Sequence, residues 1–171
     1  MKKLIFITIF LLSYSFNSFA NSIHFIDFDK VLNFSKAGGD AQKKLKKKFK
    51  SESEKFVKQE EGIRKEESDL ISQKKALAPE EYKKKVEALR KKVANLQKNK
   101  QQSFNSIAKS RSDARQSLLK AVNPLIKKYM EDNKIQMVFD KQAVVMGDTT
   151  LEITDKIIAI LNKNLVSLKI N

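Results

Sequence analysis

Apolar residues recur at intervals of seven through a long charged segment, and this spacing constrains the fold more than any other feature of the chain. Nearly all residues between these positions are Lys, Glu, Ser or Gln. A core helix carries three or four apolar positions in every two turns, whereas a heptad repeat gives a narrow stripe that suits one neighbouring helix. The repeat therefore predicts a coiled-coil helix. Its five positions are Phe49, Phe56, Ile63, Leu70 and Leu77.

A second heptad pattern follows after a short break. Apolar residues from Tyr82 to Leu96 are spaced by four and three residues in turn, which indicates a second coiled-coil helix. The sequence APEE at 78–81 separates the two patterns, and Pro79 suits the first turn of a helix. So short a connection makes the second helix return antiparallel to the first. We therefore expect residues 41–116 to form a hairpin arm with its tip near 78–81.

The middle of this arm is expected to be loosely packed. With the turn at 78–79, Phe49 should face Ala108, and Gly62 should face Asn95. Glycine inside a helix costs about 1 kcal/mol relative to alanine, so we interpret Gly62 as a hinge. The alternative is an arm that is loose without any selection for compliance. If Phe49 and its repeats are position a of the heptad, the d positions hold Leu45, Glu52, Gln59, Glu66 and Gln73. Half of the stripe in the first helix is therefore polar.

The two ends of the chain are β-rich. We expect strands at 23–28, 135–140 and 142–147, where β-branched and aromatic residues are concentrated. The sequence SKAGGD at 35–40 predicts a turn, with Asp40 as the N-cap of the first arm helix. The sequence DTT, which follows the third predicted strand, indicates a loop.

An amphipathic helix closes the chain, with Thr154 or Asp155 as its expected N-cap. The second arm helix should extend beyond the start of the first, so that its most apolar part packs on the strands. Residues 21–40 and 117–171 are thus expected to form a small β-rich body, and the fold class is α+β. A three-stranded sheet leaves its edges unpaired, so we expect several copies to join edge to edge.

The first twenty residues have the features of a secretory signal peptide. Two lysines precede the apolar run LIFITIFLL, and SFA at 18–20 supplies small residues for cleavage. The run is too short to span a bilayer, although a retained membrane anchor is the alternative. We therefore expect residues 1–20 to be removed and the mature chain to begin at Asn21, outside the cytoplasm.

The mature chain is strongly basic and has no cysteine. Of the 35 basic residues, two precede the expected cleavage site, which leaves 33 against 20 acidic residues and a net charge of +13. Such a chain favours anionic partners. An exported fold without cysteine has no disulfides, so packing or oligomerisation must hold it together.

Other function classes find less support in the sequence. His24 is the one histidine, and neither a phosphate-binding glycine loop nor a metal-ligand spacing is present, which argues against an enzyme. Asp27 and Asp29 alternate on one face of the first predicted strand, and we interpret them as the end of a strand that leads into a turn. The positive charge of the chain would also suit nucleic acid, which it would bind with an affinity that depends on salt. The expected export argues against nucleic acid as a physiological partner. A structural coiled coil of the cell envelope stays an alternative.

The order of these elements resembles the Skp (OmpH-like) family of periplasmic chaperones. The sequence IHFIDFDKVLNFSKAGGDAQKKLKKKF at 23–49 is similar to the family's opening strand and the beginning of its arm. The sequence IQMVFDKQAVVMGDTTLEITDKIIAILNK at 135–163 is similar to the family's closing strands and helix. The arm matches in character only, because charged coiled coils resemble one another.

The resemblance implies a periplasmic homotrimer. In this family, a β-barrel shared by three subunits forms the body, and three arms surround a cavity. The cavity holds unfolded outer-membrane β-barrel proteins, the clients, without ATP or any other cofactor. The resemblance also implies why the apolar stripe is narrow: each arm helix pairs with one neighbour, and its other faces stay hydrated or meet a client.

Candidate client contacts are apolar residues of the arm, since many weak contacts on a flexible surface can hold clients in varied conformations. We expect Val57, Ile71 and Phe104 to lie off the stripe, and Phe56 and Ile63 to lie beside the loose middle of the arm. The alternative is that these five side chains fill the interior of the hairpin.

The tip of the arm is basic. Eight basic residues lie between positions 74 and 92, against three acidic ones. They are candidates for contact with acidic clients, anionic headgroups or lipopolysaccharide, with which family members are associated, while a solvated charged surface is the alternative. The eight are Lys74, Lys75, Lys83, Lys84, Lys85, Arg90, Lys91 and Lys92.

Overall fold

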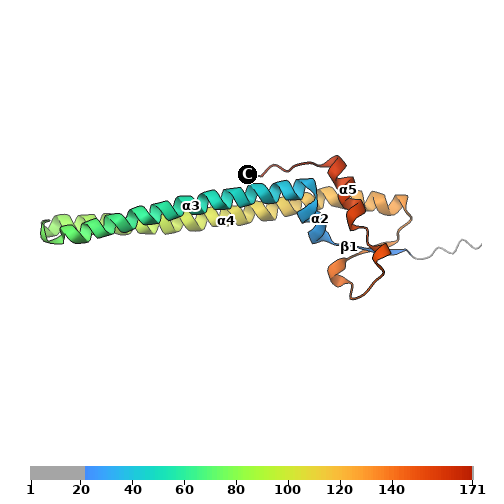
Figure 1. The fold of residues 1–171 in the computed structure, drawn as a ribbon, viewed down its shortest axis with the longest axis horizontal. Helices are drawn as coiled ribbons and strands as arrows, with labels where there is room; N and C mark the ends of the chain where they lie inside the picture. Colours follow the sequence, from blue (N-terminus) through green and yellow to red (C-terminus); the bar gives the residue numbers. More distant parts are fainter. Residues whose placement is uncertain (1–21, 171) are drawn as a thin grey trace, which may run out of the picture.

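The computed structural model describes residues 22–170 and consists of a long two-helix arm with a small body at one end (Figure 1). The arm comprises α3 (Lys36–Ser72) and α4 (Pro79–Asp132), joined through the 3₁₀ turn η1 (Gln73–Lys75). The body contains β1 (Ile23–Ile26), α2 (Phe28–Phe34), β2 (Met137–Asp140), η2 (Lys141–Ala143), η3 (Thr149–Leu151) and α5 (Thr154–Asn164). The expected signal peptide, residues 1–20, lies outside the described residues.

The antiparallel hairpin is present, and its register agrees with the prediction, because Gly62 and Asn95 line one hollow between the two helices. The ring of Phe104 lies between two turns of α3, 5.4 Å from the ring of Phe49 and 5.9 Å from that of Phe56. The first arm helix is shorter than expected, since α3 ends at Ser72, before Leu77, and the chain turns through η1. Pro79 occupies the first turn of α4, as predicted.

Few side chains are buried between the two arm helices. Leu96 is buried in the middle of the arm, beside Gly62. The other buried side chains lie nearer the body: Ala41, Leu45, Phe56, Ile107 and Ala114. Residues 57–95, which we call the distal arm, contain no buried side chain. Half-buried apolar contacts and exposed charged contacts therefore hold the two helices of the distal arm together.

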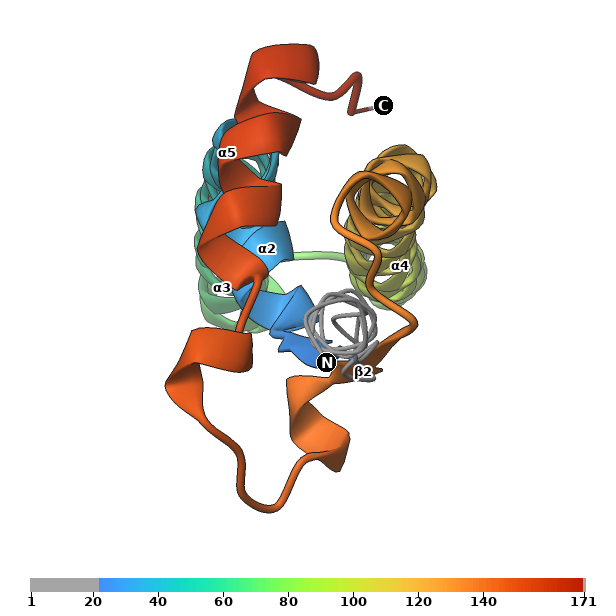
Figure 2. The ribbon, with the colours of Figure 1, turned by 90° about the vertical axis from the view of Figure 1, so that its right-hand side faces the viewer.

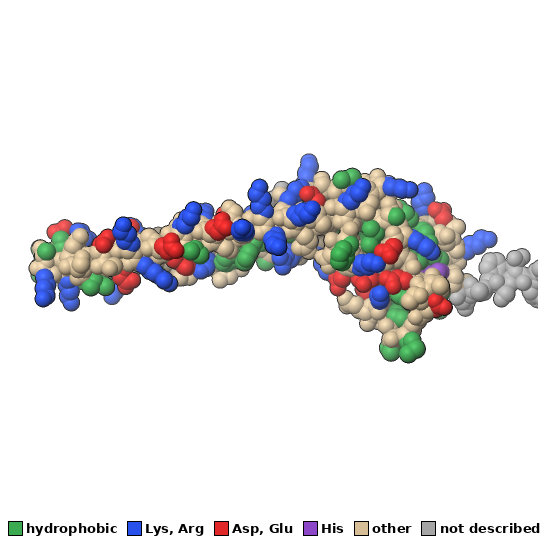
Figure 3. All heavy atoms as spheres, in the orientation of Figure 1, with side chains coloured by type: hydrophobic (Ala, Val, Ile, Leu, Met, Phe, Trp, Pro, Cys, Tyr) green, Lys and Arg blue, Asp and Glu red, His purple; other side chains and the backbone are tan. Residues whose placement is uncertain are grey.

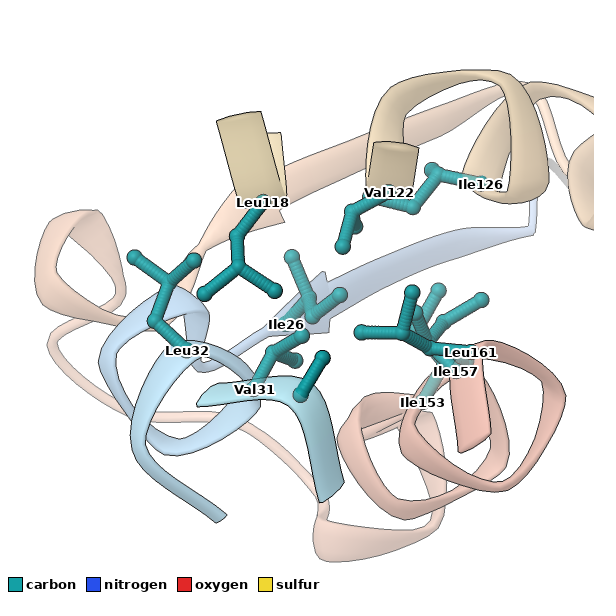
Figure 4. Close-up of a cluster of buried hydrophobic side chains, with 10 residues drawn as sticks. Ile26, Val31, Leu32, Leu118, Val122, Ile126, Ile153, Ile157 and Leu161 are labelled. Carbon is teal, nitrogen blue, oxygen red and sulfur yellow. The ribbon is translucent and has the colours of Figure 1, made fainter. Parts of the chain in front are cut away.

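The core of the body lies where α4 continues past the start of α3. Seen along the arm, α2 lies between α3 and α4, and α5 lies on the α3 side (Figure 2). Leu118 and Val122 of α4 point toward Ile26 of β1, Val31 of α2 and Ile157 of α5 (Figure 4). The extension of α4 into the body is as expected, but its apolar face packs on the helices α2 and α5 in addition to β1.

The sheet has two parallel strands instead of the three that the sequence predicts. Ile23 of β1 pairs with Met137 of β2, and this register continues along both strands. The predicted strand at 142–147 is wrong: its first residues form η2, and Val145 and Met146 are almost fully exposed. Among residues 22–170 no neighbouring strand lies beside this segment, so its β-propensity alone does not make it a strand.

The sequence interpretation of residues 27–40 is also corrected. The first strand ends at Ile26, and Asp27 caps α2 by accepting a hydrogen bond from the Lys30 amide at 2.7 Å. The predicted turn at 35–40 is the start of α3, capped by Ser35 and not by Asp40. A Cβ on Gly38 would overlap the Leu32 carbonyl oxygen, so this glycine permits the close approach of α2 and α3.

The N-cap of α5 is Ile153, and neither Thr154 nor Asp155 takes that position. Thr154 is instead the first helical residue, and its buried hydroxyl accepts a hydrogen bond from the Asp27 amide at 2.9 Å. The same hydroxyl donates to Glu152 at 2.7 Å. The predicted cap thus serves to join α5 to the beginning of α2.

Candidate functional site

The distal arm has an apolar groove along one side. Both arm helices contribute its walls, and its volume is about 430 Å³. The α4 wall comes from the part of the second heptad stripe between Tyr82 and Val93, whose side chains are half-buried or exposed. The lining residues are Ile63, Glu67, Leu70, Ile71, Tyr82, Val86, Leu89, Arg90, Val93 and Ala94.

A polar hollow lies beside Gly62, also between the two helices. Gly62 shares it with Gln59, Asn95 and Asn99, among other residues, and a Cβ on Gly62 would meet no atom within 4 Å. The expected proximity of Gly62 and Asn95 is therefore observed. No close approach of another element requires glycine here.

Two ion pairs between α3 and α4 bracket this hollow. Lys100 contacts Glu60 at 2.7 Å, and Lys92 contacts Glu66 at 2.6 Å. The hydrogen bond and the charge of Lys100 lower the pKa of Glu60. The middle of the arm is thus joined by charged contacts where a buried apolar seam would be expected in a rigid coiled coil.

The five predicted contact residues fall into different environments. Phe56 is buried, and its ring lies 5.9 Å from that of Phe104, which therefore lies within the seam and not off it. Val57 is 51% exposed and Ile71 is 62% exposed, as expected for positions off the stripe. Ile63 is half-buried and lines the apolar groove together with Ile71.

The basic residues of the tip surround the arm and do not gather into one patch. Consecutive positions such as 83, 84 and 85 are about 100° apart around a helix, and Figure 3 shows lysine and arginine side chains on both edges of the arm. Lys85 contacts Glu81 at 3.6 Å. Within residues 22–170, Lys83, Lys84 and Lys91 make no ion pair of 4.0 Å or less. These charges give the tip a positive field without forming a focused anion site.

The candidate polar residues of the body have structural partners. The two aspartates do not share a strand face, because Asp27 caps α2 and Asp29 lies in its first turn. Asp29 accepts hydrogen bonds from Arg115 at 3.1 Å and Gln142 at 2.8 Å, which connects the root of α4 to η2. The Nδ1 atom of His24 lies 3.0 Å from the Leu151 carbonyl oxygen. In the part of the chain that the structure describes, no three His, Cys, Asp or Glu side chains are grouped so as to hold a metal ion.

The body also exposes an apolar hollow of about 470 Å³ beside the sheet. Hydrophobic side chains appear at the lowest point of the body in Figure 3, where the segment between η2 and η3 lies in Figure 1. Val145 and Met146 belong to this segment. The hollow is lined by Ile23, His24, Phe25, Phe139, Ala143, Val144, Val145, Met146, Gly147 and Leu151.

Sequence reasoning missed the α4 wall of the apolar groove. Tyr82, Val86, Leu89 and Val93 were assigned to a coiled-coil seam by their heptad spacing, yet Val93 is 40% exposed. The polar d positions of α3 are the signal that could have revealed this, because a half-polar stripe cannot cover a fully apolar one. Among residues 22–170, no helix combines the length and hydrophobicity that a bilayer-spanning segment needs.

Comparison with known proteins identifies relatives of this chain. The family model described as "Outer membrane protein (OmpH-like)" matches residues 22–161. No curated protein sequence matches the chain significantly. Among solved structures, one described as a candidate outer membrane chaperone (OmpH-like) from Caulobacter crescentus CB15 superposes with a TM-score of 0.82. The alignment covers 88% of this chain and 89% of the other at 17% sequence identity, so it establishes the shared fold.

Proposed function

Because the chain belongs to the OmpH-like family of outer membrane proteins, we propose that it is a periplasmic chaperone that holds unfolded outer-membrane β-barrel proteins. It keeps these clients from aggregating during transit and needs neither ATP nor another cofactor. The solved structure with the same fold is itself described as a candidate outer membrane chaperone. The expected signal peptide, residues 1–20, agrees with a periplasmic location.

The observation that carries this proposal is the half-exposed apolar surface of the distal arm. Unfolded barrel strands present apolar side chains that aggregate unless they are covered. The distal arm offers apolar side chains without burying any of them, and basic residues surround these side chains. A surface of this kind covers a client by many weak contacts and selects no single conformation.

We propose a homotrimer in which the small bodies join and the three arms enclose the client. A two-stranded sheet is marginal in isolation and leaves strand edges unpaired. The apolar hollow beside the sheet and the exposed side chains of Val145 and Met146 favour burial against other subunits. The segment 142–147 would then gain in the trimer the neighbouring strand that one subunit does not supply.

Contact of the arm's tip with anionic headgroups or lipopolysaccharide is a second candidate function. It is favoured by the tip lysines that have no ion pair within residues 22–170, such as Lys83, Lys84 and Lys91. Cosedimentation with vesicles of anionic lipid, neutral lipid or neutral lipid with lipopolysaccharide would separate the two anionic sources. Binding should weaken as salt rises.

The test of the chaperone proposal is the native mass of the mature protein, alone and mixed with a urea-unfolded outer-membrane β-barrel diluted into buffer. We expect a trimer alone, and a trimer with one bound client when the unfolded barrel is present. The pre-folded barrel is the matched control and should neither bind nor compete. A monomer or dimer that leaves the client to aggregate would instead favour a structural coiled coil of the envelope.

A further inference from the structure

The apolar groove of the distal arm belongs to a single subunit. α3 supplies Ile63, Leu70 and Ile71, and α4 supplies the facing stripe that includes Val86 and Val93. Both walls therefore exist before any arm meets another arm. Whatever fits this groove can bind to one arm without the enclosure that three arms create.

The dimensions of the groove suit an extended segment. Its α4 wall runs from Tyr82 to Val93, a rise of about 16 Å at about 1.5 Å per residue. An extended chain covers that length with about five residues, and side chains on one face of it are about 6.6 Å apart. Successive stripe residues of α4 are about 4.5 to 6 Å apart along the helix axis, so both rows have similar spacing. A volume of 430 Å³ holds a few side chains, whereas a whole helix is about 10 Å wide.

The charges around the groove define the chemistry of the occupant. The lining itself carries one charge of each sign, Glu67 in the α3 wall and Arg90 in the α4 wall. The excess of positive charge comes from the surrounding tip, which has eight basic residues against three acidic ones between positions 74 and 92. A bound strand that places apolar side chains in the groove turns its alternate side chains away from the arm, where the positive field of the tip still acts on them. Acidic side chains at these alternate positions would be favoured by charge complementarity.

A second copy of the arm is a poor occupant. Each arm has the same excess of positive charge at its tip, so two tips repel one another. A stable protein interface also needs about 800 Å² from each partner, which a groove of this length does not provide. A short, weakly held segment of an unfolded chain matches both the charge and the size.

We propose that each distal arm binds, by itself, one extended client segment of about five residues in which apolar side chains alternate with acidic or polar ones. This inference rests on the proposed chaperone function, since it names the feature of the client that the arm recognises. Binding is weak at each arm and gains strength when several segments of one client occupy several arms.

The test uses the full mature protein and a fluorescent peptide with the repeating sequence Val-Asp-Tyr-Thr-Val-Asp-Ile-Thr. Fluorescence anisotropy should detect binding of this peptide. A peptide of the same composition with its four apolar residues contiguous should bind more weakly. A peptide with lysine in place of aspartate should also bind more weakly, and Arg90→Gln should reduce the preference for aspartate over lysine. Equal binding of all three peptides would overturn the proposed alternation and charge preference.

Variants place the binding in the groove. The double variant Ile71→Ser with Val93→Ser changes two exposed groove residues. It should weaken binding of the peptide by at least about tenfold, because it removes apolar surface that the complex would bury. Val166→Ser is the control, because Val166 is 63% exposed and lies in the C-terminal tail. Circular dichroism should show unchanged helicity in both. If the double variant binds the peptide as tightly as the wild type does, the groove is not the peptide-binding site.

The outcome also separates this inference from the proposed function. Suppression of aggregation of an unfolded barrel by the wild-type protein tests the chaperone proposal on its own. If the protein suppresses aggregation but does not bind the peptide, the chaperone proposal stands and the proposal of a peptide-binding groove is rejected. If it binds the peptide but does not suppress aggregation, the chaperone proposal is rejected and the arm is a peptide-binding element only.

Discussion

Replacing Gly62 with alanine should stiffen the middle of the arm. The backbone of Gly62 is helical, with no positive φ, and a Cβ there would meet no atom within 4 Å. Alanine therefore fits without displacing any neighbour, and it favours the helix by about 1 kcal/mol. Since 1.4 kcal/mol corresponds to a factor of ten, local opening around residue 62 should become about fivefold rarer.

Amide hydrogen exchange measures this effect residue by residue. In the Gly62→Ala variant, amides around position 62 should exchange about fivefold more slowly than in the wild type. Gly39→Ala is a matched control in the same helix, because a Cβ at Gly39 meets only the Asn33 carbonyl oxygen, at 3.8 Å. The effect of Gly39→Ala on exchange should be confined to the start of α3, where the arm joins the body. Unchanged or faster exchange around position 62 would refute the hinge interpretation.

The same pair of variants tests whether compliance serves client capture. A stiffer arm adapts less well to clients of different size, so Gly62→Ala should hold less of a large unfolded barrel than the wild type does. Gly39→Ala should hold the wild-type amount. Equal capture by all three proteins would mean that the loose middle of the arm has no part in holding clients.

Three further predictions concern the body. Gly38→Ala should lower the free energy of unfolding by about 3 kcal/mol, because the new Cβ would overlap the Leu32 carbonyl oxygen. Thermal denaturation should show a lower Tm, and an unchanged Tm would contradict the close approach of α2 and α3. Ile157→Ala empties a fully buried site and should cost about 2 to 5 kcal/mol in urea denaturation, whereas Val166→Ala at an exposed site should change stability by less than about 0.5 kcal/mol. Hydrogen bonds from a threonine hydroxyl and a lysine lower the pKa of Glu152 from 4.5, so its ionised form stabilises the body above pH 4.5. That contribution should be lost as pH falls through the lower folded-state pKa, and urea denaturation of Glu152→Gln should show a smaller loss over this range than the wild type.

The arm was predictable because one physical signal, the heptad spacing of apolar residues, determines it over many turns. The position of the turn was less predictable. The stretch from Gln73 to Leu77 has no helix-breaking residue, yet α3 ends at Ser72, whose hydroxyl donates a hydrogen bond to the Asp69 carbonyl oxygen at 2.7 Å. A local hydrogen bond of this kind competes with helix continuation and leaves little trace in apolar spacing.

The body was less predictable because its contacts join distant parts of the sequence. Helix α2 was missed, although Asp27 stands at an N-cap position and Val31 and Leu32 supply a short buried face. The sequence suggests β-structure for 142–147, but a strand also needs a partner at the right place, which spacing along the chain does not reveal. The same holds for Thr154, whose hydrogen bond to the Asp27 amide spans 127 positions.

The candidate site was predicted in part. The exposure of Val57 and Ile71 followed from their position off the stripe. The burial of Phe56 against Phe104 did not, because it depends on the register between the two helices. The groove as a whole depends on how far the two stripes separate, which is a property of the pair of helices and not of either sequence pattern.

The parallel pairing of β1 with β2 has a consequence for the order in which the chain folds. The Ser22 hydroxyl donates to the Lys134 carbonyl oxygen across 112 positions, and closing so long a loop in a disordered chain is entropically costly and slow. The arm removes this difficulty, because its turn is local and can form within microseconds. Growth of the hairpin from the tip toward the body then brings the start of α3 next to Leu118, in the last third of α4, and leaves only short ends to search for each other. The first strand of the chain is therefore among the last parts to find its place, and a chain cut short before residue 137 would form an arm but no sheet.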